Sequence, residues 1–401
     1  MPARQVTAHE RLRSAAFLSS FDRFTIPALL VPIHKALGIS LGTAALIASV
    51  YFVTYGLSQP LWGGLSDRFG RVRVLRTAIA GGGLAALVSA TAPTVAVLMV
   101  GRALAGLFFA AAMPTAMTYV SETVADDQRQ SKLAVLMAFA TAGVAAGTIA
   151  GGVLAELWSW RVAFLASALL ATAVSIFLIP LKEPTTPKPK AGFIAQVNEI
   201  AKDRWVRVVV ALALVEGAVV FGALTFVSAS LQPEGIGAAL AGSAAAGFGI
   251  SNSLATPLVT RAIQRRASPV LIAGGASLAA AGLLLAAIDQ AVVTAIIATV
   301  ALGSGFGFLH STLQLWATQV HPHARAVTIS FFAGAVFTGG AVASAAAAPL
   351  VDAGRFSAVF FAAAAGAVLL AIVGSQARAR FLQTGRVPLS AAEAEPVAVA
   401  P

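Results

Sequence analysis

The chain has 401 residues, of which 58% are hydrophobic and only 11% are charged, and its formal net charge is +11. Apolar stretches of about 20 residues, each long enough to cross a hydrocarbon core of ~30 Å, recur along it, so a soluble globular protein is excluded. The chain has no cysteine, which excludes disulfides, thiolate catalysis and cysteine metal sites.

The apolar stretches predict twelve membrane spans. They cover residues 14–36, 43–64, 74–92, 95–119, 132–156, 161–181, 206–231, 237–259, 269–288, 291–318, 326–350 and 355–377. Basic residues gather in every second connection, whereas the alternate connections hold only Lys35, Arg161 and Arg355. By the positive-inside rule, both termini are expected in the cytoplasm. Since the basic residues follow this alternation and also suit contact with membrane lipid headgroups, we expect no nucleic-acid partner.

The first predicted span carries two charged residues, Asp22 and Arg23. An ionisable residue at a helix centre costs at least ~2.5 kcal/mol, so each needs a partner or a function. At ~1.5 Å per residue, Asp22 and Arg102 of the fourth span both reach the middle third of the bilayer. Two alternatives stay open for them: a permanent ion pair, or a carboxylate whose protonation follows conformation. Arg23 is expected to extend toward the headgroups.

Two spans carry polar stripes at helical spacing. The second span holds Tyr51, Tyr55 and Gln59, and the tenth holds His310 and Gln314. Such stripes face other helices or a water-filled cavity and not lipid. These five residues are therefore candidates for a substrate cavity, with hydrogen bonding between helices as the alternative. A histidine in such a place can also titrate near neutral pH.

The run from Gly63 to Arg73 places four charged residues and three glycines within eleven positions, directly after the second span. A run of this kind between two apolar spans predicts a tight turn at the membrane edge. Gly70 is expected to adopt a positive φ, and Arg71 is expected to reach Glu122 at the end of the fourth span. From the residues alone, such a turn needs no more than a local ion pair, which is worth little on a wet surface.

A polar stretch divides the spans into six and six, and the halves share an internal repeat. The tetrapeptide from Ile79 to Gly82 recurs from Ile272 to Gly275, which indicates duplicated halves with a substrate site between them. The expected organisation is an N-terminal bundle at 1–181, a cytoplasmic linker at 182–205 whose second half is a short amphipathic helix, a C-terminal bundle at 206–386 and a disordered tail at 387–401.

Small residues four apart mark the fifth and eighth spans, and a carboxylate marks the seventh. The small residues are Gly143, Gly147 and Gly151 in one span and Gly237, Ala241, Ala245 and Gly249 in the other. They let the backbones of two helices approach closely, which suits static packing and sliding of the helices equally well.

The remaining ionisable residue within a span is Glu216, a second candidate for proton coupling.

The charged loop matches the pattern Gly-x-x-x-Asp-Arg-x-Gly-Arg-x-Arg, and by this match the chain resembles the major facilitator superfamily of secondary transporters. The run Gly101–Gly106 is similar to the Arg-x-x-x-Gly signature of the fourth helix in that family, where it is associated with proton coupling. Phe21-Asp22-Arg23-Phe24 resembles the first helix of bacterial drug:proton antiporters. The chain departs from the antiporter pattern at Thr148, where those proteins have proline, a departure that bears on export but not on the fold.

This resemblance implies an all-α membrane protein with twelve transmembrane helices in two pseudo-symmetric six-helix bundles. It also implies a conformational latch that steadies the outward-open state, formed by Gly63, Asp67, Arg68, Gly70, Arg71 and Glu122. In the latch, Asp67 is expected to face a helix N-terminus of the other half, where the helix dipole favours a carboxylate. The candidates for proton coupling are Asp22, Arg102 and Glu216.

We therefore expect a monomeric secondary transporter in the bacterial cytoplasmic membrane. We expect it to export a small amphiphilic or lipophilic solute in exchange for protons by alternating access. The alternative is a proton symporter that takes up a metabolite or organic anion, with Arg102 binding its carboxylate. A membrane sensor and a membrane enzyme are disfavoured, and no cofactor or metal is expected, since the chain has neither His-Glu-x-x-His nor a phosphate loop.

Overall fold

The computed structural model describes residues 2–184 and 193–386, and within these ranges the chain is helical and contains no strand. The first half comprises α1 (Pro2–Leu37), α2 (Leu41–Phe69), α3 (Arg71–Ala90), α4 (Val95–Phe109), α5 (Ala112–Thr123), α6 (Asp126–Leu157) and α7 (Trp160–Leu178). A short helix, α8 (Phe193–Lys202), lies in the linker where one was predicted. Residues 185–192 of the predicted linker and the predicted tail at 387–401 lie outside the described residues.

The second half is built from shorter helical pieces. It comprises α9 (Arg204–Gly217), η1 (Ala218–Gly222), α10 (Ala223–Leu231), η2 (Gln232–Glu234), α11 (Ala238–Ala245), α12 (Gly247–Arg265), α13 (Ser268–Ile288), α14 (Val292–Val320), η3 (Pro322–Ala324), α15 (Arg325–Ala346), α16 (Ala348–Asp352), α17 (Phe356–Leu369), η4 (Leu370–Gly374) and α18 (Ser375–Leu382). Of these, η1 and η4 are π-helical turns inserted between α-helices.

Side-chain caps and one proline set several of the helix boundaries. Ser40, Thr94, Ser159 and Asp203 each precede a helix, and each accepts a hydrogen bond from a backbone N–H in its first turn, as N-cap residues do. The predicted fourth span is divided into α4 and α5 ahead of Pro114. Proline lacks the N–H that would continue the helix and its ring crowds the carbonyl four residues earlier, so the break falls where the chemistry requires it.

Eleven helical segments in the described ranges are long and apolar enough to cross a membrane. All eleven predicted spans other than the eighth begin or end within a few residues of these segments, and the second span runs on as one helix to Phe69. The predicted eighth span, 237–259, coincides with α11 and α12. These two helices are separated at Ala246, so together they follow the course of the remaining span while neither forms one long apolar helix.

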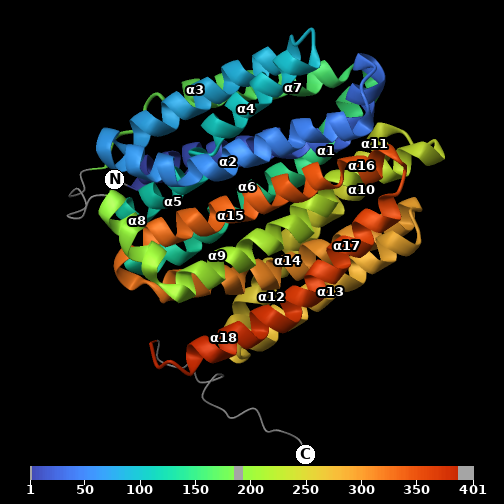
Figure 1. The fold of residues 1–401 in the computed structure, drawn as a ribbon. Helices are drawn as coiled ribbons and strands as arrows, with labels where there is room; N and C mark the ends of the chain where they lie inside the picture. Colours follow the sequence, from blue (N-terminus) through green and yellow to red (C-terminus); the bar gives the residue numbers. More distant parts are fainter. Residues whose placement is uncertain (1, 185–192, 387–401) are drawn as a thin grey trace, which may run out of the picture.

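The helices form two bundles that pack against each other along a long interface (Figure 1). In Figure 1 the blue helices α1–α4 occupy the upper part and the orange to red helices α13, α17 and α18 the lower part. Across the interface α2 packs on α15, α6 packs on α11 and α12, and α1 packs on α10 and α11. The fifth and eighth predicted spans therefore meet across the halves. Their small residues permit this: a Cβ on Gly152 would lie 2.2 Å from the carbonyl oxygen of Ala238.

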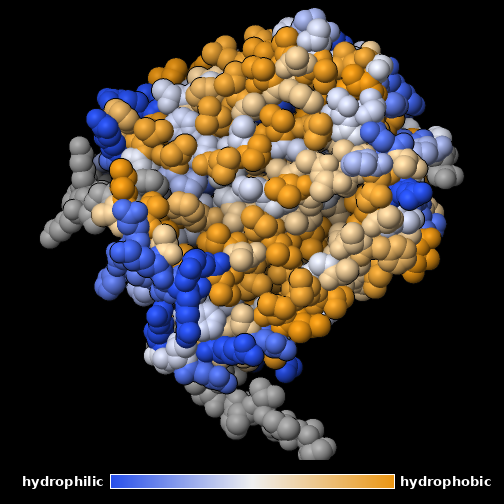
Figure 2. Space-filling model, viewed as in Figure 1, coloured by the Kyte–Doolittle hydropathy of each residue, from blue (hydrophilic) through white to orange (hydrophobic). Residues whose placement is uncertain are grey.

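The outer surface is apolar around the middle of the molecule and polar at its two ends, as Figure 2 shows for one face. Large hydrophobic side chains such as Leu57, Leu84, Leu169 and Leu254 are well exposed on the helices. Soluble proteins rarely expose a continuous apolar surface of this size, whereas such a surface suits contact with lipid. The fold is therefore that of a multi-pass membrane protein.

The two ends of the bundle differ, and we name them here. The termini end carries the start of α1, the turn at Gly70, α8 and α18, whereas the opposite end carries the α1–α2 turn and the start of α11 (Figure 1). At the opposite end Glu156 of α6 accepts a hydrogen bond from the N–H of Ala239 at 2.7 Å. Asp352 accepts from the N–H of Gly42 at 2.6 Å. Each carboxylate thus joins one half to a helix N-terminus of the other, and the halves are fastened together at this end.

Candidate functional site

A buried ion pair joins α1 to α4 in the first half. Nη1 and Nη2 of Arg102 donate to Oδ1 and Oδ2 of Asp22 at 3.1 and 2.5 Å, and neither side chain is exposed. The guanidinium carbon also lies 4.7 Å from the ring centroids of Tyr51 and Phe164. A bidentate contact of this kind is among the stronger charge pairings in proteins. The two residues that the sequence placed at one depth are therefore direct partners.

A second buried carboxylate lies in the other half, where it meets a histidine. Oε1 of Glu216 on α9 lies 3.1 Å from Nδ1 of His310 on α14, and Oε2 has no hydrogen-bond partner in the described structure. The Glu216 side chain is fully buried, whereas 20% of the His310 side chain is exposed. The ring of Phe306 stacks on His310 with 4.6 Å between centroids. The sequence predicted different roles for these two residues, and the structure brings them together.

Between the two ionic pairs lies a cluster of aromatic rings, which we call the aromatic cluster. It consists of Phe24, Phe52, Phe221, Phe248, Phe306 and Phe337, and the ring of Phe221 lies 5.3 to 6.2 Å from each of the other five. These rings come from both halves of the chain. Phe221 itself lies in the π-helical turn η1, which begins two residues after Glu216. Such turns are frequent at functional sites.

Arg23 is buried beside this cluster, so the prediction that it extends to the headgroups is wrong. Its side chain leaves 8% of the residue exposed. The guanidinium carbon lies 4.5 Å from the ring centroid of Phe337, 4.7 Å from that of Tyr55 and 5.1 Å from that of Phe24. Three aromatic faces hold the cation at the interface because each offers the negative side of its quadrupole.

The polar-stripe candidates are distributed over this region. Tyr51 and Tyr55 are buried and their rings stack at 5.9 Å, with Arg102 over the first and Arg23 over the second. Gln59 is also buried, and Gln314 is half-buried. A cavity of about 820 Å³ lies elsewhere, at the termini end, where α8 and the start of α9 meet His321.

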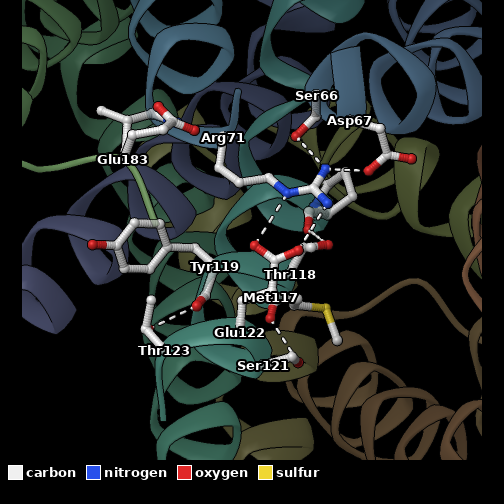
Figure 3. Close-up of polar contacts among 12 residues, drawn as sticks. Ser66, Asp67, Arg71, Met117, Thr118, Tyr119, Ser121, Glu122, Thr123 and Glu183 are labelled. Atoms are coloured by element: carbon white, nitrogen blue, oxygen red, sulfur yellow. Dashed lines mark hydrogen bonds and ion pairs between the residues drawn. The ribbon is translucent and has the colours of Figure 1, made fainter. Parts of the chain in front are cut away.

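The charged loop forms a compact network centred on Arg71 (Figure 3). Its Nη2 and Nε donate to Glu122 at 2.8 and 3.3 Å, and its Nη1 donates to Ser66 at 3.0 Å and pairs with Asp67. The expected contact between Arg71 and Glu122 is present. Asp67 keeps 39% of its side chain exposed, and its ion pair is within its own half. Arg68 is exposed, with its guanidinium over Phe69.

Gly70 has the positive φ that its place in the turn predicted, at 101°. Sequence reasoning missed its neighbour Glu183, whose two carboxylate oxygens accept from the N–H of Val72 at 3.0 and 3.2 Å. A Cβ on Gly70 would lie 2.6 Å from one of those oxygens. Glu183 therefore supplies the carboxylate at the N-terminus of α3. The signal available in the sequence was an acidic residue directly after the sixth span, facing a basic loop.

Ser40 lies in Gly38-Ile39-Ser40-Leu41-Gly42, a spacing that also surrounds nucleophilic serines in some hydrolases. The structure gives it a different task. Its hydroxyl accepts from the N–H of Thr43 and donates to Asp352 at 2.9 Å. The nearby His34 contacts the carbonyl oxygen of Ile39. Ser40 is thus a helix cap and part of the fastening at the opposite end.

Charged groups at the termini end join α8 to His321 and the start of α9 to Arg386. Nε2 of His321 lies 2.9 Å from Glu199, and Arg386 donates to Asp203 at 2.8 Å. Burial raises the pKa of Asp203, but the N–H of Trp205 and the guanidinium of Arg386 outweigh it, so the net pKa lies below its ordinary value. Asp203 is therefore held in its charged form where the linker enters α9.

Comparison with known proteins gives consistent matches. The profile of the Major Facilitator Superfamily matches residues 13–345. The chain is 32% identical over 149 residues to a puromycin resistance protein of Streptomyces alboniger, a match covering 37% of this chain and 30% of that protein. It is 29% identical over 221 residues to the bacillibactin exporter of Bacillus subtilis, covering 51% and 55%. It is 30% identical over 187 residues to the class C tetracycline resistance protein of Escherichia coli, covering 45% and 46%. The matched segments thus span well under two thirds of these relatives.

Solved structures match over almost the whole chain. A bacterial homologue of the human lysosomal transporter Spinster, in an inward-facing and unoccupied conformation, has a TM-score of 0.74 at 16% identity, covering 94% of this chain and 97% of that one. A D-xylose–proton symporter has a TM-score of 0.74 at 16% identity, covering 92% and 96%. At these identities the likeness establishes the fold alone.

Proposed function

This chain belongs to the major facilitator superfamily, and from that premise we propose that it is a proton-coupled exporter of a small amphiphilic or lipophilic solute. As a member of that family it is a multi-pass membrane transporter of small molecules, and not an enzyme. The proposal adds three things: the bacterial cytoplasmic membrane as its location, protons as the coupling ion, and export as the direction. It also places both termini, and so the termini end, in the cytoplasm.

The observation that carries the proposal is the presence of one buried carboxylate in each half, each held by a single basic partner on another helix. Asp22 is held by Arg102, and Glu216 by His310. Burial favours the neutral form of a carboxylate, and a nearby cation favours the charged form. Any movement that separates carboxylate and cation therefore promotes proton uptake. Conversely, protonation weakens the pair and frees the two helices to move.

The partial exposure of His310 supports a route for protons to Glu216. The histidine is the only one of these four side chains with a substantial exposed fraction, at 20%. Nδ1 contacts Glu216, so a proton accepted from water at the other ring nitrogen leaves Nδ1 able to deliver one to the carboxylate. In the proposed cycle, solute leaves the central region when these acids are protonated from outside.

Alternating access requires that the two ends close in turn. The carboxylates at the opposite end, Glu156 and Asp352, fasten the halves there. We assign this arrangement to a state closed to the outside. The charged loop acts in the other state: as the termini end closes, Asp67 leaves Arg71 and meets the second half, while Glu122 keeps Arg71 in place. The Asp67 side chain is 39% exposed, which supports a carboxylate that is free to move.

Export is favoured over uptake by the relatives, several of which are named for resistance or export. The test uses inverted membrane vesicles with an imposed proton gradient, acidic inside, and radiolabelled puromycin and tetracycline as probes. An exporter accumulates a probe only when the gradient is present. Asp22→Asn and Glu216→Gln are expected to abolish gradient-driven accumulation, while Asp289→Asn, an exposed carboxylate at the opposite end, leaves it intact. Full gradient-driven accumulation in both buried-site variants contradicts the coupling assignment. Accumulation only in right-side-out vesicles with the gradient reversed, acidic outside, indicates symport.

A further inference from the structure

Arg23 is a buried cation for which the described part of the chain supplies no acidic partner. The residue is 8% exposed. The adjacent carboxylate, Asp22, has both oxygens engaged by Arg102. The hydrogen bond that Arg23 does make, from Nη2 to the hydroxyl of Ser20, is long at 3.3 Å. Its Nε and Nη1 have no hydrogen-bond partner among the residues that the structure describes.

This arrangement is unfavourable for a purely structural residue. A guanidinium has five N–H donors, and burying a charge without a hydrogen-bonded counter-ion is costly. The rings of Tyr55, Phe337 and Phe24 offset only part of this free-energy cost, since a cation–π contact contributes about 0.5 to 2 kcal/mol. The fold therefore keeps two buried donors of a planar cation without an acceptor among the described residues. A carboxylate at either donor would make a charge-assisted hydrogen bond and supply the missing counter-ion.

The position of Arg23 suits a solute that both halves must hold. Arg23 and Tyr55 belong to the first half and Phe337 to the second, so a group bound to the guanidinium lies at the moving interface. The aromatic cluster continues from Phe337 through Phe221, which gives an apolar wall next to the cation. A ligand with differential contacts to the two arrangements of the halves is what shifts an equilibrium between them.

We propose that Arg23 binds the anionic group of the transported solute, and that the solute is an amphiphilic organic acid whose apolar body lies against the aromatic cluster. The inference rests on the proposed transport function and names its substrate class. It also replaces Arg102 as the carboxylate-binding residue, because Nη1 and Nη2 of Arg102 already donate to Asp22. Proton coupling and solute binding are thus assigned to separate arginines: Arg102 pairs directly with Asp22, and Arg23 is the next residue after Asp22 in the chain.

The test is a binding measurement that needs no proton gradient. Purified full-length protein is melted in the presence of four acids and their neutral amides: benzoate, 2-naphthoate, indole-3-acetate and decanoate. We expect at least one acid to bind wild-type protein about tenfold or more tightly than its amide, a difference of about 1.4 kcal/mol. In Arg23→Gln the preference is expected to fall below about threefold, and Arg23→Lys is expected to retain part of it. The control is Arg161→Gln, whose guanidinium also lies over a ring, that of Trp160, at 4.2 Å.

The apo melting temperatures separate this role from packing. If Arg23 awaits a ligand, Arg23→Gln removes an unpaired charge and the apo protein melts no lower than wild type. A lower apo melting temperature with an unchanged acid preference identifies a packing residue and overturns the inference. So does a wild-type protein that binds no acid more tightly than its amide. Failure of gradient-driven accumulation in vesicles, by contrast, leaves acid binding intact and counts only against the proposed export.

Discussion

Asp352 at the end of α16 accepts a hydrogen bond from the backbone N–H of Gly42 in the first turn of α2, 2.6 Å away and 310 positions earlier in the chain. Glu156 at the end of α6 makes the reciprocal contact with Ala239 in the first turn of α11. Each half thus contributes one carboxylate to a helix N-terminus of the other. The arrangement follows the internal duplication, because α6 and α16 end the fifth and eleventh predicted spans, and α2 and α11 lie in the second and eighth.

Removing both caps is expected to open the opposite end. A carboxylate at a helix N-terminus contributes about 0.3 to 2 kcal/mol, so Glu156→Gln with Asp352→Asn shifts the equilibrium by up to several hundredfold toward the state open at that end. The chain has no native cysteine, so spin labels can be placed at introduced cysteines without background. Distances between labels at the exposed positions Lys35 and Val293 are expected to lengthen. The matched control is Asp289→Asn at the same end, and an unchanged distance distribution in the double variant refutes the gate.

The buried pair of Asp22 and Arg102 makes a distinct stability prediction. Asp22→Asn leaves a fully buried guanidinium without its counter-ion, which costs about 3 to 5 kcal/mol. Arg102→Gln alone removes the cation but leaves the carboxylate. Combining Asp22→Asn with Arg102→Gln is expected to restore most of the stability, because neither charge then remains. Melting temperatures of the four proteins in detergent measure the coupling; additive losses in the double variant count against a direct pair.

Much of the central site follows from the sequence, and the missing parts have a common cause. Asp22 and Arg102 were predictable as a pair because two charges at one depth in a membrane need each other. Glu216 and His310 stand on the seventh and tenth spans, and their contact depends on how two helices are rotated, which hydropathy does not encode. Arg23 was placed at the headgroups by its length alone, whereas the aromatic faces that bury it come from three separate helices.

The carboxylates at helix ends were the least predictable residues. Glu156, Glu183 and Asp352 each occur beside a turn, where an acidic residue ordinarily faces water. What distinguishes them is the helix N-terminus opposite, and its position depends on the packing of whole bundles. The turn at Gly70 is the contrasting case, because its backbone requirement is local and a glycine in a tight charged turn indicates it directly.

Gly70→Ala is expected to destabilise the turn for two separable reasons. The backbone at φ 101° and ψ 152° lies in a region that side chains rarely adopt, at a cost of order 1 to 3 kcal/mol. The new Cβ would also lie 2.6 Å from Glu183. Adding Glu183→Ala is expected to relieve the clash but not the backbone strain, so only part of the loss returns. Gly274→Ala, with open space around its Cβ and no positive φ, is the control and is expected to melt like wild type.

The charge of Asp203 predicts how the contact between the start of α9 and Arg386 responds to acid. Because its folded-state pKa lies below its ordinary value, Asp203 contributes stability that is fully present above the ordinary pKa of about 4. That contribution decreases as pH falls below this value and is lost once pH passes the lower folded-state pKa. Asp203→Asn keeps a helix cap but removes the titrating group. The stability difference between wild type and Asp203→Asn, followed by thermal melting, is therefore expected to stay constant from about pH 8 to 5 and to shrink below about pH 4. A difference that grows on acidification contradicts the assignment, and Arg386→Gln, which removes the cation paired with Asp203 at 2.8 Å, is expected to reduce the same difference at neutral pH.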